Sequence, residues 1–113
     1  MEPERARALL ADADAAAVRN LADLGAEITA ITEARQDANS DDEHDPEGTT
    51  IAYERSQADA LRRIAEERRV AVAAAVARLD QGRYGICVRC GKPIAEGRLE
   101  ARPWADTCVD HAR

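Results

Sequence analysis

Two short metal-ligand pairs near the C-terminus constrain this chain more than any other feature. In order along the sequence they are Cys87-Val88-Arg89-Cys90 and, after a gap of seventeen residues, Cys108-Val109-Asp110-His111. They contain all three cysteines of the chain and one of its two histidines. Because each pair offers two donors to one side of a metal, two such pairs suit one tetrahedral zinc ion. We therefore predict a Zn²⁺ site whose ligands are Cys87, Cys90, Cys108 and His111.

The alternatives for these cysteines are a redox-active pair and a disulfide. A redox C-x-x-C normally opens a helix in a βαβ unit, which this sequence lacks, and three cysteines do not pair evenly. Four protein donors leave no open coordination position, so the predicted site is structural rather than catalytic. Residues 82–113 carry six basic and four acidic side chains, and we expect them to fold as a small zinc finger.

Two long stretches before the finger show the apolar spacing of paired helices. Alternating steps of three and four residues place one seam at Leu10, Asp14, Ala17, Leu21, Leu24, Ile28 and Ile31, and another at Ala58, Leu61, Ala65, Arg68, Val72, Ala75 and Leu79. Such spacing is typical of coiled coils. Pro3 and Pro46 suit the first turn of a helix, and Gly82 suits the position just after a helix end.

The predicted fold is mainly α, an antiparallel coiled-coil helical hairpin followed by the finger. We expect one helix from about Pro3 to Gln36 and a second from about Pro46 to Gln81, so that the hairpin occupies residues 1–81. At 1.5 Å per residue each arm is about 45 Å long. The alternative is a dimeric coiled coil in which two chains pair their seams, but the turn signals between the helices favour a monomer that folds back.

The link between the two helices, at about residues 37–48, is strongly acidic and contains no lysine or arginine. A solvated loop explains part of this charge, because Asp45 suits a helix N-cap and Glu47 the first helical turn. A solvated loop does not explain why the link carries acidic residues in addition to Asp45 and Glu47. A projecting acidic tip could reach a metal ion or a basic channel. The candidate partner-binding residues of the tip are Asp41, Asp42, Glu43 and Asp45.

Composition excludes several classes of function. The chain has no run of about eighteen apolar residues, so we expect no membrane span. Its net charge is −6 and it has three aromatic side chains, a poor basis for direct nucleic-acid binding. No catalytic triad or glycine-rich phosphate loop is present, and we expect no enzyme activity. Zinc-held thiols fit the cytoplasm.

Three runs of residues in the finger resemble the DksA/TraR family of bacterial transcription regulators. They are Tyr84-Gly85-Ile86-Cys87-Val88-Arg89-Cys90-Gly91, Arg98-Leu99-Glu100-Ala101-Arg102-Pro103 and Ala105-Asp106-Thr107-Cys108. The resemblance implies a coiled-coil hairpin attached to a zinc finger. It also implies that the hairpin enters the secondary channel of RNA polymerase, where acidic tip residues act near the catalytic magnesium. The expected outcome is altered promoter complexes without sequence-specific DNA contact.

The chain departs from the family pattern at several positions. His111 replaces the usual fourth cysteine, and imidazole is an ordinary zinc donor. At the tip the family has Asp-x-x-Asp-x-Ala, whereas here Asp45 is followed by Gly48 and Thr50 at the second and third of these positions. The other readings of the chain are an interaction adaptor without a polymerase role and a weak nucleic-acid-binding zinc ribbon.

The resemblance also bears on guanosine tetraphosphate, which some members of the family bind through basic residues on the finger and nearby helices. Arg98 and Asp110 match finger positions of that site. Ala71 and Ala112 stand where lysines are expected, which argues against dependence on this nucleotide.

Overall fold

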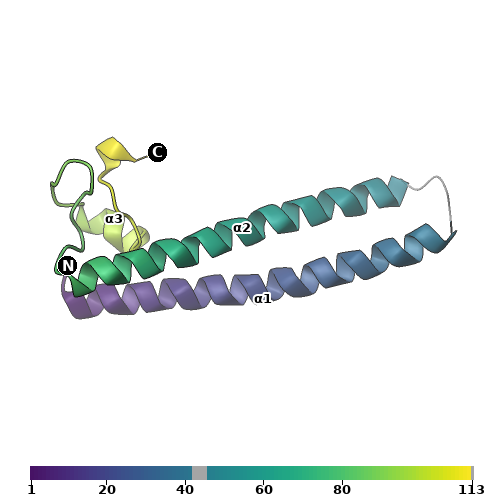
Figure 1. Cartoon of the computed structure of the whole chain (residues 1–113), viewed down its shortest axis with the longest axis horizontal. Helices are drawn as coiled ribbons and strands as arrows, with labels where there is room; N and C mark the ends of the chain where they lie inside the picture. Colours follow the sequence, from purple (N-terminus) through teal and green to yellow (C-terminus); the bar gives the residue numbers. More distant parts are fainter. Residues whose placement is uncertain (42–45, 113) are drawn as a thin grey trace. The chain divides into compact units, whose positions relative to one another are not determined.

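The structure is a computed structural model. It describes the backbone of residues 1–41 and 46–112, and it does not describe the side chains of residues 37–48. Four helices follow one another along the described chain: α1 (Pro3–Asp41), α2 (Pro46–Asp80), α3 (Glu96–Ala101) and the short 3₁₀ helix η1 (Val109–His111). Figure 1 traces them from the purple start of α1 to the yellow turn of η1 near the C-terminus. Among the described residues, no helix combines the length and apolar character that a membrane span needs.

The ends of α1 and α2 follow the helix signals of the sequence. Pro3 and Pro46 are each the first residue of a helix, where a missing backbone N–H costs nothing. After α2, Gly82 takes a φ of +72°. Its N–H donates to the carbonyl of Leu79 at 3.1 Å, and the N–H of Arg83 donates to the carbonyl of Arg78 at 2.8 Å. This pair of bonds is a Schellman motif, which ends the helix as Gly82 predicts.

The expectation that the first helix ends near Gln36 was wrong, because α1 continues for five more residues to Asp41. Residues 37–41 contain neither proline nor glycine, so nothing in the sequence prevents further helical turns. The predicted tip at about 37–48 therefore begins inside the helix, and residues 42–45 lie outside the described residues.

Contacts divide the chain into two compact units, and each contains a part of both long helices. Unit 1 consists of Met1–Ala17 and Glu67–Arg113, and unit 2 is Val18–Glu66. In unit 1 the start of α1 packs on the end of α2 around Leu10, Val72 and Ala75, which are 0–4% exposed. Two ion pairs join the same helices, Arg7 to Asp80 at 2.7 Å and Arg69 to Asp14 at 2.9 Å.

In unit 2 buried apolar side chains lie on both helices, and a hydrogen bond joins the two helices. Ile31, Ala58 and Ala65 are buried, and Arg55 Nη1 donates to Thr32 Oγ1 at 2.7 Å. In unit 1 the α2 partner falls from Asp80 to Arg69 as the α1 partner rises from Arg7 to Asp14, so the pairing is antiparallel. The mainly helical hairpin fold is confirmed.

Not every predicted seam position faces the partner helix. Leu61 was placed in the second seam, yet it is 53% exposed. The seam positions before and after it, Ala58 and Ala65, are 2% and 7% exposed, so alanines rather than Leu61 occupy the buried face of α2. Asp14, which interrupts the first seam, lies at its edge and pairs with Arg69.

The finger has its own small core of Cys87, Ile94, Leu99 and Ala105. Met1 and Tyr84 pack against it from outside, and the Tyr84 hydroxyl donates to the Pro103 carbonyl at 2.8 Å. Six-residue helices such as α3 are unstable on their own. Here α3 is held by Leu99 in the core and by ion pairs from Arg5 of α1 to Glu96 at 3.7 Å and Glu100 at 3.1 Å.

Candidate metal centre

Four donor atoms from the two ligand pairs converge at one point of the finger. The Sγ atoms of Cys87, Cys90 and Cys108 and a ring nitrogen of His111 all lie within 4.8 Å of one another. Cys90 Sγ is 3.8 Å from Cys108 Sγ, and His111 Nδ1 is 3.8 Å from Cys87 Sγ and 3.2 Å from Cys108 Sγ. A zinc tetrahedron with Zn–S bonds of about 2.3 Å has edges of about 3.8 Å. The spacing and the chemistry of the donors therefore fit zinc.

Tight turns bring the ligands of each pair together. We call residues 87–90 the first knuckle and residues 108–111 the second knuckle. In the first, the N–H of Gly91 donates to the Cys87 carbonyl at 2.9 Å, and Gly91 takes a φ of +73° that other residues rarely adopt. In the second, the N–H of His111 donates to the Cys108 carbonyl at 3.0 Å and closes a 3₁₀ turn.

The two thiols of the first knuckle differ in their tendency to ionise. Burial of Cys87 opposes ionisation, but hydrogen bonds from backbone N–H groups of Cys108, Cys90 and Arg89 outweigh it and lower the pKa of Cys87 to about 6. The N–H of Lys92 favours the Cys90 thiolate. Burial and hydrogen bonds with the thiols of Cys87 and Cys108 oppose it, and the pKa of Cys90 is raised. Of these two thiols, Cys87 is therefore the one that more readily forms the thiolate that binds a cation.

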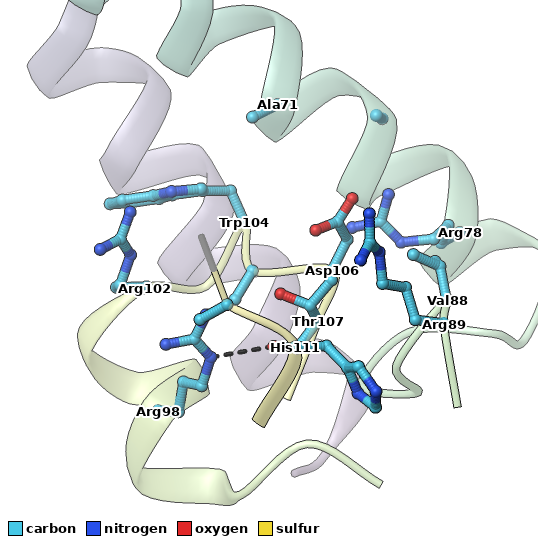
Figure 2. A pocket seen from close by; sticks show the side chains of 13 residues that line it. Ala71, Arg78, Val88, Arg89, Arg98, Arg102, Trp104, Asp106, Thr107 and His111 are labelled. Atoms are coloured by element: carbon cyan, nitrogen blue, oxygen red, sulfur yellow. Dashed lines mark hydrogen bonds between the residues drawn. The ribbon is translucent and has the colours of Figure 1, made fainter. Parts of the chain in front are cut away.

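Unit 1 also contains a cavity of about 580 Å³ beside the second knuckle. We call it the arginine cavity, because four arginines line it: Arg78, Arg89, Arg98 and Arg102. Figure 2 shows these side chains around Asp106 and Thr107. Ala71 and Ala112, which stand where the family resemblance expects lysines, line the same cavity, and so does Arg98.

Trp104, the only tryptophan of the chain, packs against the helix cluster of Leu10, Val72 and Ala75. The Arg68 guanidinium of α2 lies 4.0 Å from the centre of the Trp104 ring, a distance typical of a cation–π contact. Trp104 therefore attaches the finger to the hairpin helices of unit 1.

The structure brings together all four predicted metal ligands but does not test the predicted tip. Asp41 is the last residue of α1, and its side chain is not described; Asp42, Glu43 and Asp45 lie outside the described residues. Sequence reasoning missed the ion pairs of Arg5 and the packing of Met1 on the finger core. No local pattern could have revealed these contacts, because their partners lie more than eighty residues away.

Comparison with known proteins supports the predicted zinc finger. Residues 82–110 match the family described as prokaryotic dksA/traR C4-type zinc finger. The match ends one residue before His111, the ligand that differs from a four-cysteine set. A 39-residue segment is 46% identical to RNA polymerase-binding transcription factor DksA of Haemophilus influenzae. A 35-residue segment is 49% identical to an uncharacterized protein of Aquifex aeolicus.

These curated relatives match only over a short segment. The matched segments are 34% and 31% of this chain and 27% and 24% of the two relatives. One solved structure, transcription factor DksA2 from Pseudomonas aeruginosa, covers 91% of this chain and 79% of its own, with a TM-score of 0.51 and 23% identity. That likeness shows the fold, a helical hairpin with an appended finger. The predicted resemblance is confirmed: the chain carries a zinc finger of the DksA/TraR family at residues 82–110, and zinc is its metal.

Proposed function

We propose that this chain is an RNA polymerase-binding transcription regulator, and that its zinc site is structural. The observation that carries the proposal is the combination of a DksA/TraR finger with a long antiparallel helix pair in one small chain. A relative that shares the finger segment is named for polymerase binding. The proposed partner is therefore RNA polymerase, without sequence-specific contact to DNA, and the proposed location is the cytoplasm.

The zinc site in this proposal is made by Cys87, Cys90, Cys108 and His111. Three thiolates and a neutral imidazole complete a tetrahedral shell, so no position remains for a substrate or an activated water. Bound zinc holds the two knuckles together and thereby fixes the finger core to which Met1 and Tyr84 attach. The metal supports the fold, and we propose no enzyme activity.

The finer part of the proposal concerns the secondary channel of the polymerase. A helix of 35 residues such as α2 is about 52 Å long, enough to reach into a deep channel. The last residue of α1 and the segment that joins it to α2 carry the candidate effector acids Asp41, Asp42, Glu43 and Asp45. Carboxylates are the ligands that magnesium prefers, and they can alter its coordination when brought close. In this way the chain would modulate promoter complexes.

The test is localised cleavage on core polymerase from the host of this chain. Fe²⁺ replaces Mg²⁺ in the polymerase active site and generates hydroxyl radicals, which cut any polypeptide held nearby. We expect the zinc-loaded chain to bind and to be cut near residues 38–48. Binding without cleavage would move the contact away from the secondary channel. Absence of binding at micromolar concentration would favour the adaptor role, and salt-sensitive binding to nucleic acid alone would favour the zinc-ribbon role.

A further inference from the structure

The arginine cavity of unit 1 holds positive charge that the rest of the described chain leaves unpaired. Four arginines and one aspartate, Asp106, line it, and Figure 2 shows these side chains together. Arginines elsewhere form ion pairs with carboxylates, namely Arg5, Arg7, Arg55, Arg62 and Arg69. Among the described residues, no ion pair joins an arginine of the cavity to an acid. The cavity therefore presents a surplus of positive charge to a ligand.

Arg78 adds a buried donor that has no acceptor. Its Nη2 is the one buried side-chain nitrogen or oxygen atom of the described residues without a hydrogen-bond partner. Leaving a buried charged donor unpaired is costly, and such groups are few in native proteins. Arg78 lies in the last turn of α2, where a cation favours the helix dipole. The dipole explains the charge at this position, but it supplies no acceptor for Nη2.

Two more arginines of the cavity are available to an incoming acceptor. Arg98 Nε donates to the backbone carbonyl of Thr107 at 2.9 Å, drawn as a dashed line in Figure 2. This is the one side-chain hydrogen bond of Arg98 to a described residue, and Arg89 makes none. The bond of Arg98 holds its guanidinium in place and leaves the two terminal nitrogens to bind. A side chain that is held before binding loses less entropy when a ligand arrives.

The rest of the lining favours a protein side chain as the ligand. Most of the remaining residues are apolar, and they are Ala71, Ala74, Val88, Trp104, Ala105 and Ala112. Arginine and tryptophan are enriched in protein–protein interfaces and lysine is depleted there, and the single lysine of the chain, Lys92, does not line this cavity. A glutamate or aspartate fits such a lining. Its carboxylate can pair with a guanidinium while its carbon atoms lie on the alanine and tryptophan side chains.

A phosphate ligand fits the same cavity less well. Phosphate sites commonly use the N–H groups at a helix N-terminus, whereas α2 contributes Ala71, Ala74 and Arg78 from its C-terminal part, where the helix dipole is negative. Asp106 adds a carboxylate that repels a multiply charged anion. In addition, Ala71 and Ala112 stand where the family resemblance expects the lysines of a nucleotide site.

We propose that the arginine cavity is a docking site for an acidic segment of a partner protein, whose carboxylates pair with Arg78 and Arg89. The apolar part of the cavity then receives the carbon atoms of the same segment. The proposal goes beyond polymerase binding and does not rest on it, because a peptide alone tests the cavity.

The experiment titrates the zinc-loaded full chain with a capped peptide of alternating glutamate and alanine. A peptide with glutamine in place of glutamate is the control ligand. Binding is followed by the fluorescence of Trp104, which lines the cavity and is the only tryptophan of the chain. The variants are Arg78→Gln and Arg89→Gln. Arg83→Gln is the matched control, because it removes the same charge from an exposed arginine of unit 1 that does not line the cavity.

We expect the glutamate peptide to change the Trp104 fluorescence to saturation and the glutamine peptide to leave it unchanged. Loss of a hydrogen bond to a charged group weakens binding by about tenfold or more, which we expect for Arg78→Gln and for Arg89→Gln. Arg83→Gln should stay within about threefold of the original affinity, since an exposed charge contributes little. The melting temperature of Arg78→Gln without peptide should not fall, because the substitution removes a buried donor that has no partner.

Three results would overturn the proposal. Equal losses of affinity in all three variants would mean that the peptide responds only to the total charge of the chain. Saturable binding of inorganic tripolyphosphate without binding of the glutamate peptide would assign the cavity to a phosphate ligand. A lower melting temperature of Arg78→Gln, together with unchanged peptide binding by Arg89→Gln, would make the cavity arginines structural. Arg89 is exposed, so its variant decides the matter even if Arg78→Gln does not fold.

Discussion

Leu10 offers a direct test of how the two long helices are held together in unit 1. It is fully buried against Val72 and Ala75, and Trp104 packs on the same cluster. Replacement by alanine removes three carbon atoms, which costs about 2.4 kcal/mol at about 0.8 kcal/mol per carbon. Small neighbours such as Ala75 cannot extend into the void, and unfilled volume adds about 24 cal/mol per Å³. We therefore expect Leu10→Ala to lower the free energy of unfolding by about 3–4 kcal/mol.

The matched control is Leu61→Ala on α2. Sequence periodicity placed Leu10 and Leu61 alike in the helix seams, whereas the structure leaves Leu61 53% exposed. Substitutions at such positions usually change stability by less than about 1 kcal/mol. The assay is urea unfolding of the zinc-loaded protein, followed by circular dichroism for the helices and by Trp104 fluorescence for the cluster around Leu10. Equal losses in the two variants would refute the packing described here.

Three further outcomes are expected. Cys87→Ser should bind less than one zinc per chain and should lower the melting temperature, as measured by metal analysis and thermal unfolding; full zinc content would contradict the ligand assignment. Burial raises the pKa of Tyr84 above its ordinary value near 10, and Arg78 opposes this rise with a smaller effect. The neutral phenol therefore stabilises the folded chain below the ordinary pKa, and this stabilisation is lost as pH rises through the higher folded-state pKa. Melting curves of Tyr84→Phe should lack this loss of stability at alkaline pH. If the variant loses the same stability, another ionising group is responsible for the loss. The double variant Asp42→Asn and Asp45→Asn should keep its affinity for polymerase while losing its effect on promoter complexes; affinity that falls with the effect would make the tip an anchor.

The convergence of the four donors Cys87, Cys90, Cys108 and His111 could be predicted from sequence because their spacing limits where they can lie. Each knuckle spans only four residues, and a turn of that length places both donors on one side of a metal whatever the rest of the chain does. The antiparallel hairpin was predictable for a related reason. Its seam repeats over many turns, and proline and glycine mark the helix ends at Pro46 and Gly82.

The features that sequence reasoning missed depend on contacts between distant residues. Leu61 has the spacing of a seam residue, yet it stays exposed while Ala58 and Ala65 are buried, and spacing alone does not distinguish these positions. Trp104 could have packed on the finger or on the helices, and only the position of Arg68 and Leu10 decides between them. The hydrogen bond of Arg98 to the Thr107 carbonyl involves backbone atoms, which leave no trace in residue identity.

The division of contacts has a consequence for the order in which the chain folds. Unit 2 is continuous in sequence, whereas unit 1 joins two segments separated by the 49 residues of Val18–Glu66. Closing a long loop costs entropy, and that cost falls once the intervening segment is already compact. During synthesis residues 1–17 must therefore wait for their partner segment, Glu67–Arg113, to leave the ribosome. Zinc capture would then follow the pairing of the helices, and the nascent chain would expose Leu10 until Val72 and Ala75 emerge.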